Sequence, residues 1–215
     1  TTEIYTLSLH DALPISLATG DQGWTEVAFV TEVLRANPSK VAAWCEKFAD
    51  LPEPARGWWW TAVWQAQIPE AAAAIESFQA RADGDPAKLT YVWLSQKPQS
   101  ILDRTIRGTQ QLAMLWAAFF ASGNDAFLLK TFEAIPDPDL SDPKLSERAR
   151  QRRLSTTAAA RHQLASAAGE DADLARRLRT LAESREIPVR DAVLRVLDHP
   201  PQEGETAPLP PDGPK

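Results

Sequence analysis

The chain has 215 residues, of which 29 are acidic and 23 basic, so its formal net charge at pH 7 is −6. This mild acidic excess gives no electrostatic reason to expect a surface for nucleic acid or anionic membranes. No apolar run reaches the roughly 18 residues of a membrane-spanning helix. The single cysteine, Cys45, cannot form a disulfide within the chain and favours a cytoplasmic location, with export left open. The bias towards Ala, Arg and Pro is typical of a GC-rich bacterial genome.

Residues 1–15, TTEIYTLSLHDALPI, differ from the rest of the chain. Their pattern alone is ambiguous, because Ile4-Tyr5-Thr6 suggests a short strand and Pro14 a loop. The segment resembles, residue for residue, the translation of a common short-read DNA sequencing adapter. We therefore expect it not to be native and His10 and Asp11 to carry no chemistry. The native N-terminus, with any signal peptide or upstream domain, is then expected to be missing.

The rest of the chain shows the spacing of helices almost throughout. Apolar residues three or four positions apart predict helices, at residues 27–34, 41–48, 57–67, 69–82, 89–93, 112–119, 127–135, 144–168, 174–181 and 188–197. Turn residues separate them, for example at Gly123-Asn124, and Gly169-Glu170 interrupts the longest helical stretch. Residues 200–215 hold six prolines and little to bury, so we expect a disordered or polyproline tail there.

Pairs of helices joined by short turns recur along the chain. Each pair has an apolar helix, a small or polar turn and a second amphipathic helix, in segments 30–48, 62–78, 117–135 and 161–181. In architecture these pairs resemble the α-hairpin repeat superfamily of the TPR and HEAT kind, which implies stacked hairpins sharing a core. We predict an all-α domain over residues 17–199, built as a short solenoid-like array of helical hairpins. An irregular helical bundle is the alternative.

Eight tryptophans, four of them in GWWWTAVW at residues 57–64, are the most distinctive feature of the composition. Successive helical residues point about 100° apart, so the three consecutive tryptophans cannot share one face. Trp59 and Trp60 have apolar neighbours at helical spacing, whereas Trp58 shares its side with Thr61 and Gln65. The expected role of most of these rings is core packing. Our functional hypothesis is an aromatic surface that binds a protein or peptide, formed by Trp58, Trp60, Trp64, Trp93 and Phe120.

A cryptic enzyme is the alternative hypothesis. Cys45 and His162 are the only native candidates for a nucleophile and its base, yet neither lies in a recognisable motif, and Cys45 falls on an apolar helix face. No phosphate-binding loop, dinucleotide fingerprint or nucleophile elbow is present. We therefore expect neither catalysis nor a cofactor.

No metal site is expected either. The loop DPDLSDP, residues 137–143, matches the first ligands of a calcium-binding EF-hand, but Asp142 stands where the motif needs glycine and Arg148 where it needs glutamate. We predict a turn rich in Asp and Pro that caps the next helix. Two native His and one Cys are too few for a zinc set.

A basic run begins the helix that follows this loop. Arg148, Arg150, Arg152 and Arg153 spread over more than half the helix circumference, so a solvated helix start is expected. An RNA-contacting helical repeat ranks last among the hypotheses, because the chain is acidic and no aromatic residue is interleaved for base stacking.

Overall fold

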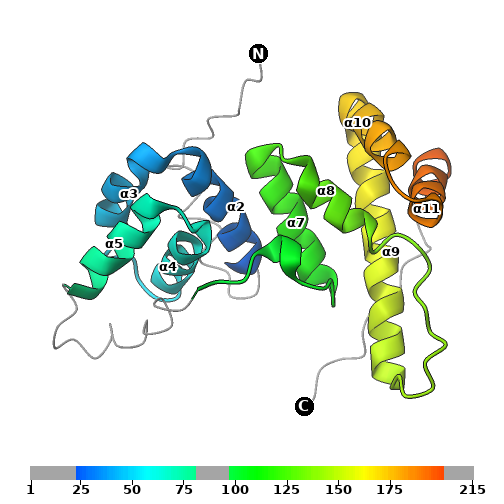
Figure 1. Ribbon diagram of the computed structural model, residues 1–215, viewed down its shortest axis with the longest axis horizontal. Coiled ribbons are helices and arrows are strands. Elements are labelled where there is room, and N and C mark those ends of the chain that lie inside the picture. The colour runs from blue at the N-terminus through cyan, green and yellow to red at the C-terminus, as the bar shows by residue number, and fades with distance from the viewer. Residues whose placement is uncertain (1–22, 81–96, 201–215) are drawn as a thin grey trace. The chain divides into compact units, whose positions relative to one another are not determined.

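The computed structural model describes residues 23–80 and 97–200, and within them the chain is all-α (Figure 1). These residues form nine α-helices and two short 3-10 helices, with no strand among them, which confirms the predicted fold class. No helix among them has both the length and the apolar character needed to cross a membrane. The predicted helix at 89–93, the segment 1–15 and residues 201–215 lie outside the described residues.

The chain divides into two compact units. The N-terminal unit comprises Thr1–Ser100 with Phe120–Gly123, and the C-terminal unit comprises Ile101–Phe119 with Asn124–Lys215. Each unit has its own set of packed helices. A single domain over 17–199 stays a prediction.

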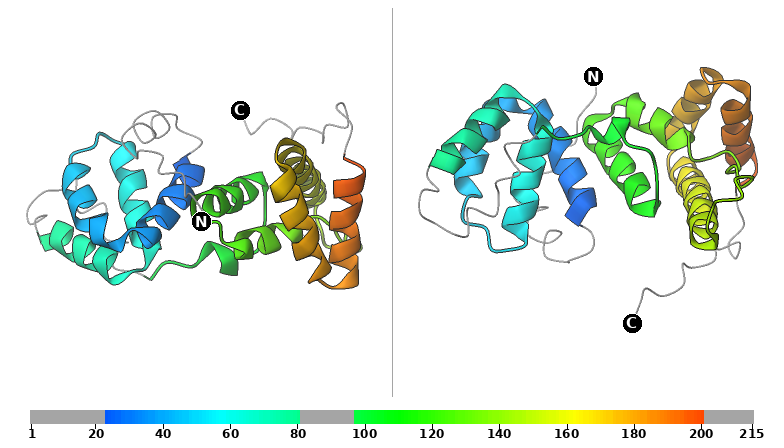
Figure 2. Two further views of the ribbon diagram at one scale, coloured as in Figure 1. Left: turned by 90° about the horizontal axis from the view of Figure 1, so that it is seen from above. Right: turned by 60° about the horizontal axis from the view of Figure 1, so that its bottom comes forward.

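In the N-terminal unit, helix α2 (Gly23–Ala36) packs along helix α4 (Ala55–Ala66). The Thr31 hydroxyl donates to the carbonyl oxygen of Ala62 (3.3 Å), and Arg35 Nε donates to that of Ala66 (2.9 Å). Both contacts join residues 31 positions apart, so the two helices run parallel. Figures 1 and 2 show them side by side.

The other two α-helices that the structure describes in this unit pack in the same alternating order. Helix α3 (Val41–Lys47), preceded by the 3-10 helix η1 (Pro38–Lys40), packs on helix α5 (Pro69–Ala80), and α5 also packs on α4. Gln67 ends α4 in the left-handed conformation (φ 52°), and Pro69 starts α5. The described residues of the unit therefore form two helix pairs in sequence, in which the first helices (α2 and α4) pack together and the second helices (α3 and α5) pack together.

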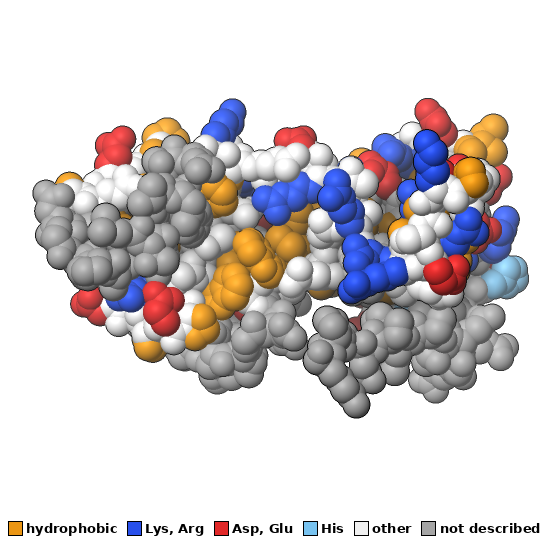
Figure 3. Space-filling view, turned by 90° about the horizontal axis from the view of Figure 1, so that it is seen from below, with side chains coloured by type: hydrophobic (Ala, Val, Ile, Leu, Met, Phe, Trp, Pro, Cys, Tyr) orange, Lys and Arg blue, Asp and Glu red, His pale blue; other side chains and the backbone are white. Residues whose placement is uncertain are grey.

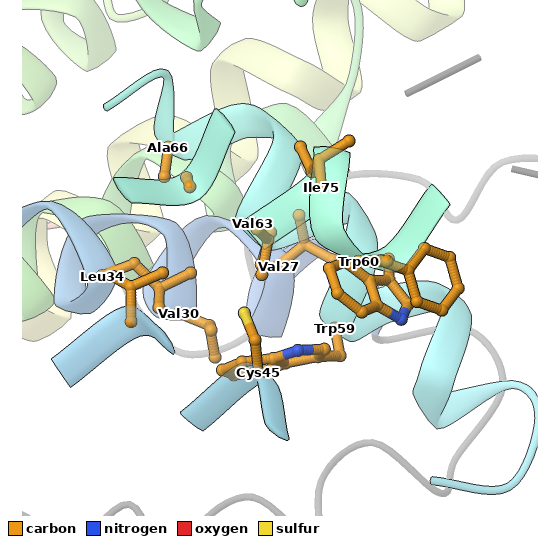
Figure 4. Packing of buried hydrophobic residues seen from close by; sticks show 13 residues of the cluster. Val27, Val30, Leu34, Cys45, Trp59, Trp60, Val63, Ala66 and Ile75 are labelled. Atoms are coloured by element: carbon orange, nitrogen blue, oxygen red, sulfur yellow. The ribbon is translucent and has the colours of Figure 1, made fainter. Parts of the chain in front are cut away.

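The core of the N-terminal unit is aromatic as well as aliphatic (Figure 4). Trp59 and Trp60 are each 1% exposed. The Trp59 ring meets Phe48 edge-on at 4.8 Å between centroids, and Trp60 lies over Phe78 at 4.0 Å. Burying rings of this size removes a large apolar area from water, which is the main stabilising contribution in a unit this small.

The C-terminal unit centres on three helices that each contact the other two. They are α9 (Glu147–Glu170), α10 (Ala172–Glu183) and α11 (Ile187–Asp198), and Leu164, Leu178 and Val193 lie fully buried between them. Asp171 accepts hydrogen bonds from the backbone N–H groups of Asp173 and Leu174. This N-cap starts α10 and explains why the helical stretch is interrupted immediately after Gly169-Glu170, as predicted.

The remaining described elements precede the three-helix bundle in the chain, and all of them except residues 120–123 belong to the C-terminal unit. They are the 3-10 helix η3 (Ile101–Asp103), α7 (Thr109–Ser122) and α8 (Asp125–Phe132), and α8 packs on α10. Gly123 has a φ of +66°, a conformation that favours glycine, and the Asn124 side chain caps α8 by accepting from the N–H of Ala126 (3.0 Å). The predicted turn at Gly123-Asn124 is confirmed.

Candidate interaction surface

Helix α4 places its three consecutive tryptophans in two environments. Trp59 and Trp60 point into the core, whereas Trp58 is only partly buried. This is the distribution that helical spacing predicts for residues about 100° apart. Of the three rings, only that of Trp58 keeps an exposed part.

Trp58 forms an aromatic corner with the first turn of α2. Its ring lies directly on Gly23, where an added Cβ would come within 2.3 Å of Trp58 Cε2. The ring of Trp24 meets it edge-on, with centroids 5.4 Å apart and planes at 68°. The sequence prediction missed Trp24, because the predicted helix began at Val27. Gly23 and Trp24, about one turn earlier, were the signal that could have extended the predicted helix.

A second pair of partly buried rings lies on α3 and just after it. By helical spacing, Trp44 and Phe48 share one face of the helix with Val41 and Cys45. Val41 and Cys45 are buried, but Trp44 and Phe48 lie at the edge of the core and are only partly covered. Lys40 Nζ lies 5.8 Å from the centroid of the Trp44 ring, and Lys47 Nζ lies 5.5 Å from that of Phe48. Both distances suit cation–π contacts.

These rings belong to a larger set, which we call the aromatic rim. Its members are aromatic, partly buried and packed against the core of the N-terminal unit: Trp24, Phe29, Trp44, Phe48, Trp58 and Trp64. Aromatic residues partly exposed round a rigid core are the type of side chain that anchors protein interfaces.

The predicted binding residues have different environments. Trp58 and Trp64 belong to the aromatic rim. Trp60 is 1% exposed and lies against Phe78, so its ring lines no surface and cannot contact a partner. Phe120 on α7 is 62% exposed. Trp93 lies outside the described residues.

The two candidate catalytic residues belong to different units. Cys45 is 4% exposed beside Trp59 in the core of the N-terminal unit (Figure 4), the position of a structural cysteine. His162 is exposed on α9 in the C-terminal unit.

The loop at residues 137–143 uses its carboxylates to close local turns. Asp139 Oδ1 accepts from the backbone N–H (2.9 Å) and the hydroxyl (2.6 Å) of Ser141, and these hydrogen bonds lower the pKa of Asp139. The predicted turn is confirmed, but the residue that caps α9 is Ser146, which accepts from the N–H of Ala149. No cluster of His, Cys, Asp or Glu suited to a metal ion occurs in the part of the chain that the structure describes.

Arginines of α9 hold this loop by its backbone. Arg153 Nη1 donates to the carbonyl oxygen of Asp139 (2.6 Å), and Arg150 Nε donates to that of Leu145 (3.3 Å). Arg161 donates to the carbonyl oxygen of Ile135 (2.9 Å) and pairs with Asp137 (2.7 Å). This pairing lowers the pKa of Asp137.

Two of the four arginines in the basic run, Arg150 and Arg153, therefore stabilise the adjacent loop. Arg148 and Arg152 are exposed, and their guanidinium groups donate no hydrogen bond within the described residues, although the Arg152 carbonyl oxygen accepts from the hydroxyls of Ser155 and Thr156. Over the helices of the C-terminal unit, at the right of Figure 3, acidic and basic side chains are interspersed. A mixed surface of this kind does not favour a nucleic-acid backbone over other partners.

A partly buried ion pair fixes the end of α4, which sequence reasoning did not anticipate. Besides its bond to Ala66, Arg35 donates through Nη2 to the carbonyl oxygen of Gln65 (2.8 Å), and its Nη1 pairs with Glu32. The guanidinium thus satisfies carbonyls that a helix C-terminus leaves without intrahelical partners. Burial raises the pKa of Glu32, and the charge and hydrogen bond of Arg35 partly oppose that rise.

Comparison of the chain with known proteins found no match. No family model matches the chain, and neither the curated proteins nor the solved structures gave a match.

Proposed function

We propose that the chain is a non-catalytic protein-interaction module of the helical-hairpin repeat kind, which binds a protein or peptide through the aromatic rim of its N-terminal unit. No cofactor is part of this proposal.

The packing of the N-terminal unit supports the repeat part of the proposal. The parallel helices α2 and α4 are related by 31 positions along the chain, and α3 and α5 pack together in the same alternating order. Helical-hairpin repeats of the TPR kind have a period of about 34 residues and stack corresponding helices against one another. Proteins of this architecture often hold a partner, although a fold by itself does not define a function.

The observation that carries the binding part is the corner between Trp58 and Trp24. The Trp58 ring rests on Gly23 and meets Trp24 at 5.4 Å, so its position is fixed before any partner arrives. A ring with a fixed position loses little conformational entropy on binding, which increases the affinity that its contact area provides. Trp44 and Phe48 add a second pair of partly covered rings in the same unit.

The experiment is affinity capture on the immobilised full chain, with three matched variants. Trp44→Gln and Trp58→Gln each remove one rim ring, and Ile187→Gln removes an exposed apolar side chain (64% exposed) from α11. We expect a captured protein that both rim variants lose and that Ile187→Gln retains. Circular dichroism and melting curves on each variant separate lost binding from lost folding. If wild type and all variants retain the same proteins, the aromatic rim is not the binding surface.

We do not propose the Cys45–His162 enzyme or the RNA-contacting repeat. No observation on Cys45 and His162 favours an enzyme over the interaction module, and none on the basic run favours an RNA-contacting repeat.

A further inference from the structure

We propose that the start of helix α9 carries a second binding surface, which binds an acidic helix of a partner protein. The surface is formed by Arg148 and Arg152, which we call the α9 arginine pair. The pair lies in the C-terminal unit and includes no residue of the aromatic rim. This inference therefore goes beyond the proposed function and does not rest on it.

The α9 arginine pair differs from most other arginines of the C-terminal unit in its contacts. Both side chains are exposed, and neither guanidinium group has a hydrogen bond or an ion pair within the described residues. Five other arginines of the unit each pair with an aspartate, at N–O distances of 2.6 to 3.0 Å: Arg161, Arg176, Arg177, Arg179 and Arg190. The α9 pair is thus open to carboxylates from another protein.

The position of the pair in the helix is electrostatically unfavourable. Helix α9 begins at Glu147, so Arg148 lies in its first turn, where the positive end of the helix dipole repels a cation. Arg148 and Arg152 are four positions apart, and like charges at this spacing destabilise a helix. No contact of the two guanidinium groups within the described residues offsets this loss. Charges that lower the stability of their own helix indicate a role outside it, because a partner's carboxylates neutralise both of them.

The pair lies on a different side of α9 from the arginines that hold the adjacent loop. At about 100° per residue, Arg150 and Arg153 are each 100° or more round the helix from both members of the pair, and they donate to loop carbonyls. Ser155 and Ala159 continue the side of the pair along α9 and are only partly buried. Figure 1 shows the first turns of α9 extending below α10 and α11. A partner helix therefore has room along this side, with small side chains that allow a close approach.

Carboxylates at helical spacing are the groups that fit the pair. Residues four positions apart on a helix have Cβ atoms about 5–6 Å apart, so glutamates at i and i+4 of a partner helix match the spacing of the two arginines. A guanidinium group binds a carboxylate through two parallel hydrogen bonds. A long polyanion such as RNA fits less well, because Glu147 and the exposed Asp142 are close in the chain and would repel it.

The first test measures binding of a fluorescein-labelled, alanine-based helical peptide to the full chain by anisotropy. The peptide carries glutamates at i and i+4 on one side, and a second peptide of the same composition carries them singly on different sides. For the paired peptide we expect a Kd of about 0.1–1 mM at low salt, which rises with salt. Arg148→Gln with Arg152→Gln should weaken its binding about three- to tenfold. The second peptide should bind the wild-type chain as weakly as the paired peptide binds this double variant.

Arg176→Gln with Arg190→Gln is the matched control. It removes the same charge from the unit, but both of these arginines already pair with aspartates, so binding should stay within about twofold of wild type. Arg148→Lys with Arg152→Lys keeps the charge of the α9 pair and loses its bidentate geometry. That variant should bind with intermediate strength.

The second test measures stability by urea unfolding. Arg148→Gln with Arg152→Gln should increase the folding equilibrium constant about two- to fivefold at low salt, because it removes both the mutual repulsion and the repulsion by the helix dipole. The increase should shrink at high salt. A variant that is more stable than wild type and binds more weakly has lost a binding group, not its fold.

Four results would overturn the inference. Three of them are equal binding of the paired peptide with and without Arg148→Gln and Arg152→Gln, equal binding of the two peptides by wild type, and a double variant less stable than wild type. The fourth is a single-stranded oligonucleotide that binds more tightly than the paired peptide and displaces it. The proposed function is tested on other residues, by capture on the Trp44 and Trp58 variants, so the two proposals can fail separately.

Discussion

The ring of Trp58 occupies the space that any side chain at position 23 would need. An alanine Cβ there would lie 2.3, 2.6 and 2.7 Å from three atoms of the indole, closer than non-bonded carbon atoms approach. Glycine at this position therefore allows α2 and α4 to meet with Trp58 between them, and Trp58 in turn supports Trp24.

Gly23→Ala should destabilise the chain by about 1–3 kcal/mol, because Trp58 or the start of α2 must shift to make room. Urea unfolding measures this change in the free energy of unfolding. Gly169→Ala is the matched control, since nothing lies within 4 Å of its added Cβ. That change should be neutral or stabilise α9 by up to about 1 kcal/mol. Equal effects at the two glycines would show that Trp58 does not restrict position 23.

Arg35→Ala should cost about 2–4 kcal/mol of folding free energy. The change removes the hydrogen bonds to Gln65 and Ala66 and leaves the Glu32 carboxylate buried without its partner. Arg176→Ala is the control, because its pair with Asp173 is exposed on both sides (75% and 85%) and should contribute about 0–1 kcal/mol. A loss at Arg35 no larger than at Arg176 would contradict the role given to the partly buried pair of Arg35 and Glu32.

The carboxyls of Glu32 and Glu26 should give the stability curve a defined pH dependence. Burial raises both pKa values above 4.5 in the folded chain, so the folded state binds protons more tightly than the unfolded state. Their contribution is therefore fully present below pH 4.5 and is lost as pH rises through the raised pKa values. Glu26→Gln with Glu32→Gln should flatten the free energy of unfolding in this window, measured in urea from about pH 4 to 7.

Asp137 and Asp139 should change the free energy of unfolding with pH in the opposite direction, and at lower pH than Glu26 and Glu32. Their pKa values are lowered below 3.8, so their contribution is present above that value and is lost only in stronger acid. If Glu26→Gln with Glu32→Gln leaves the slope of the free energy of unfolding against pH unchanged above pH 4.5, then groups other than Glu26 and Glu32 cause the pH dependence.

Trp60 and Trp44 should differ in the cost of truncation. Trp60→Ala removes a fully buried ring from contact with Phe78 and should cost about 3–5 kcal/mol. Trp44→Ala removes a partly covered ring and should cost about 1–2 kcal/mol. Chemical denaturation of both variants gives the comparison, and similar losses would mean that Trp44 is as deeply packed as Trp60.

Local spacing predicted the helices well, because each depends on residues within a few turns. Leu174 and Leu178 of α10 are buried at the predicted spacing, and Gly123 turns the chain where expected. The contacts that position the rim were not predictable in this way. Gly23 with Trp58, and Arg35 with Ala66, join residues more than 30 positions apart, and periodicity within one helix carries no information on which helix lies opposite.

The same limit explains why Trp60 was placed on the predicted surface. Helical spacing shows that Trp60 has apolar neighbours on its side of α4. Whether another helix covers that side depends on α5, because Phe78 of α5 packs against the Trp60 ring. Trp24 and Phe48 show the reverse case: both lie next to apolar positions by spacing, yet both remain only partly buried at the edge of the core.

The loop at residues 137–143 should open when its arginine contacts are removed. Arg153→Ala deletes the hydrogen bond to the Asp139 carbonyl, and Arg161→Ala deletes those to Ile135 and Asp137. Because these bonds hold a surface loop rather than the helical core, opening should increase while the free energy of unfolding changes by less than about 1 kcal/mol. Cleavage by an Asp-specific protease under native conditions should accelerate about five- to tenfold in the double variant. Arg148→Ala, at an exposed position of the same helix, is the control and should cleave at the wild-type rate. A double variant that cleaves no faster than this control would mean that the hydrogen bonds between Asp139 and Ser141 hold the loop without help from α9.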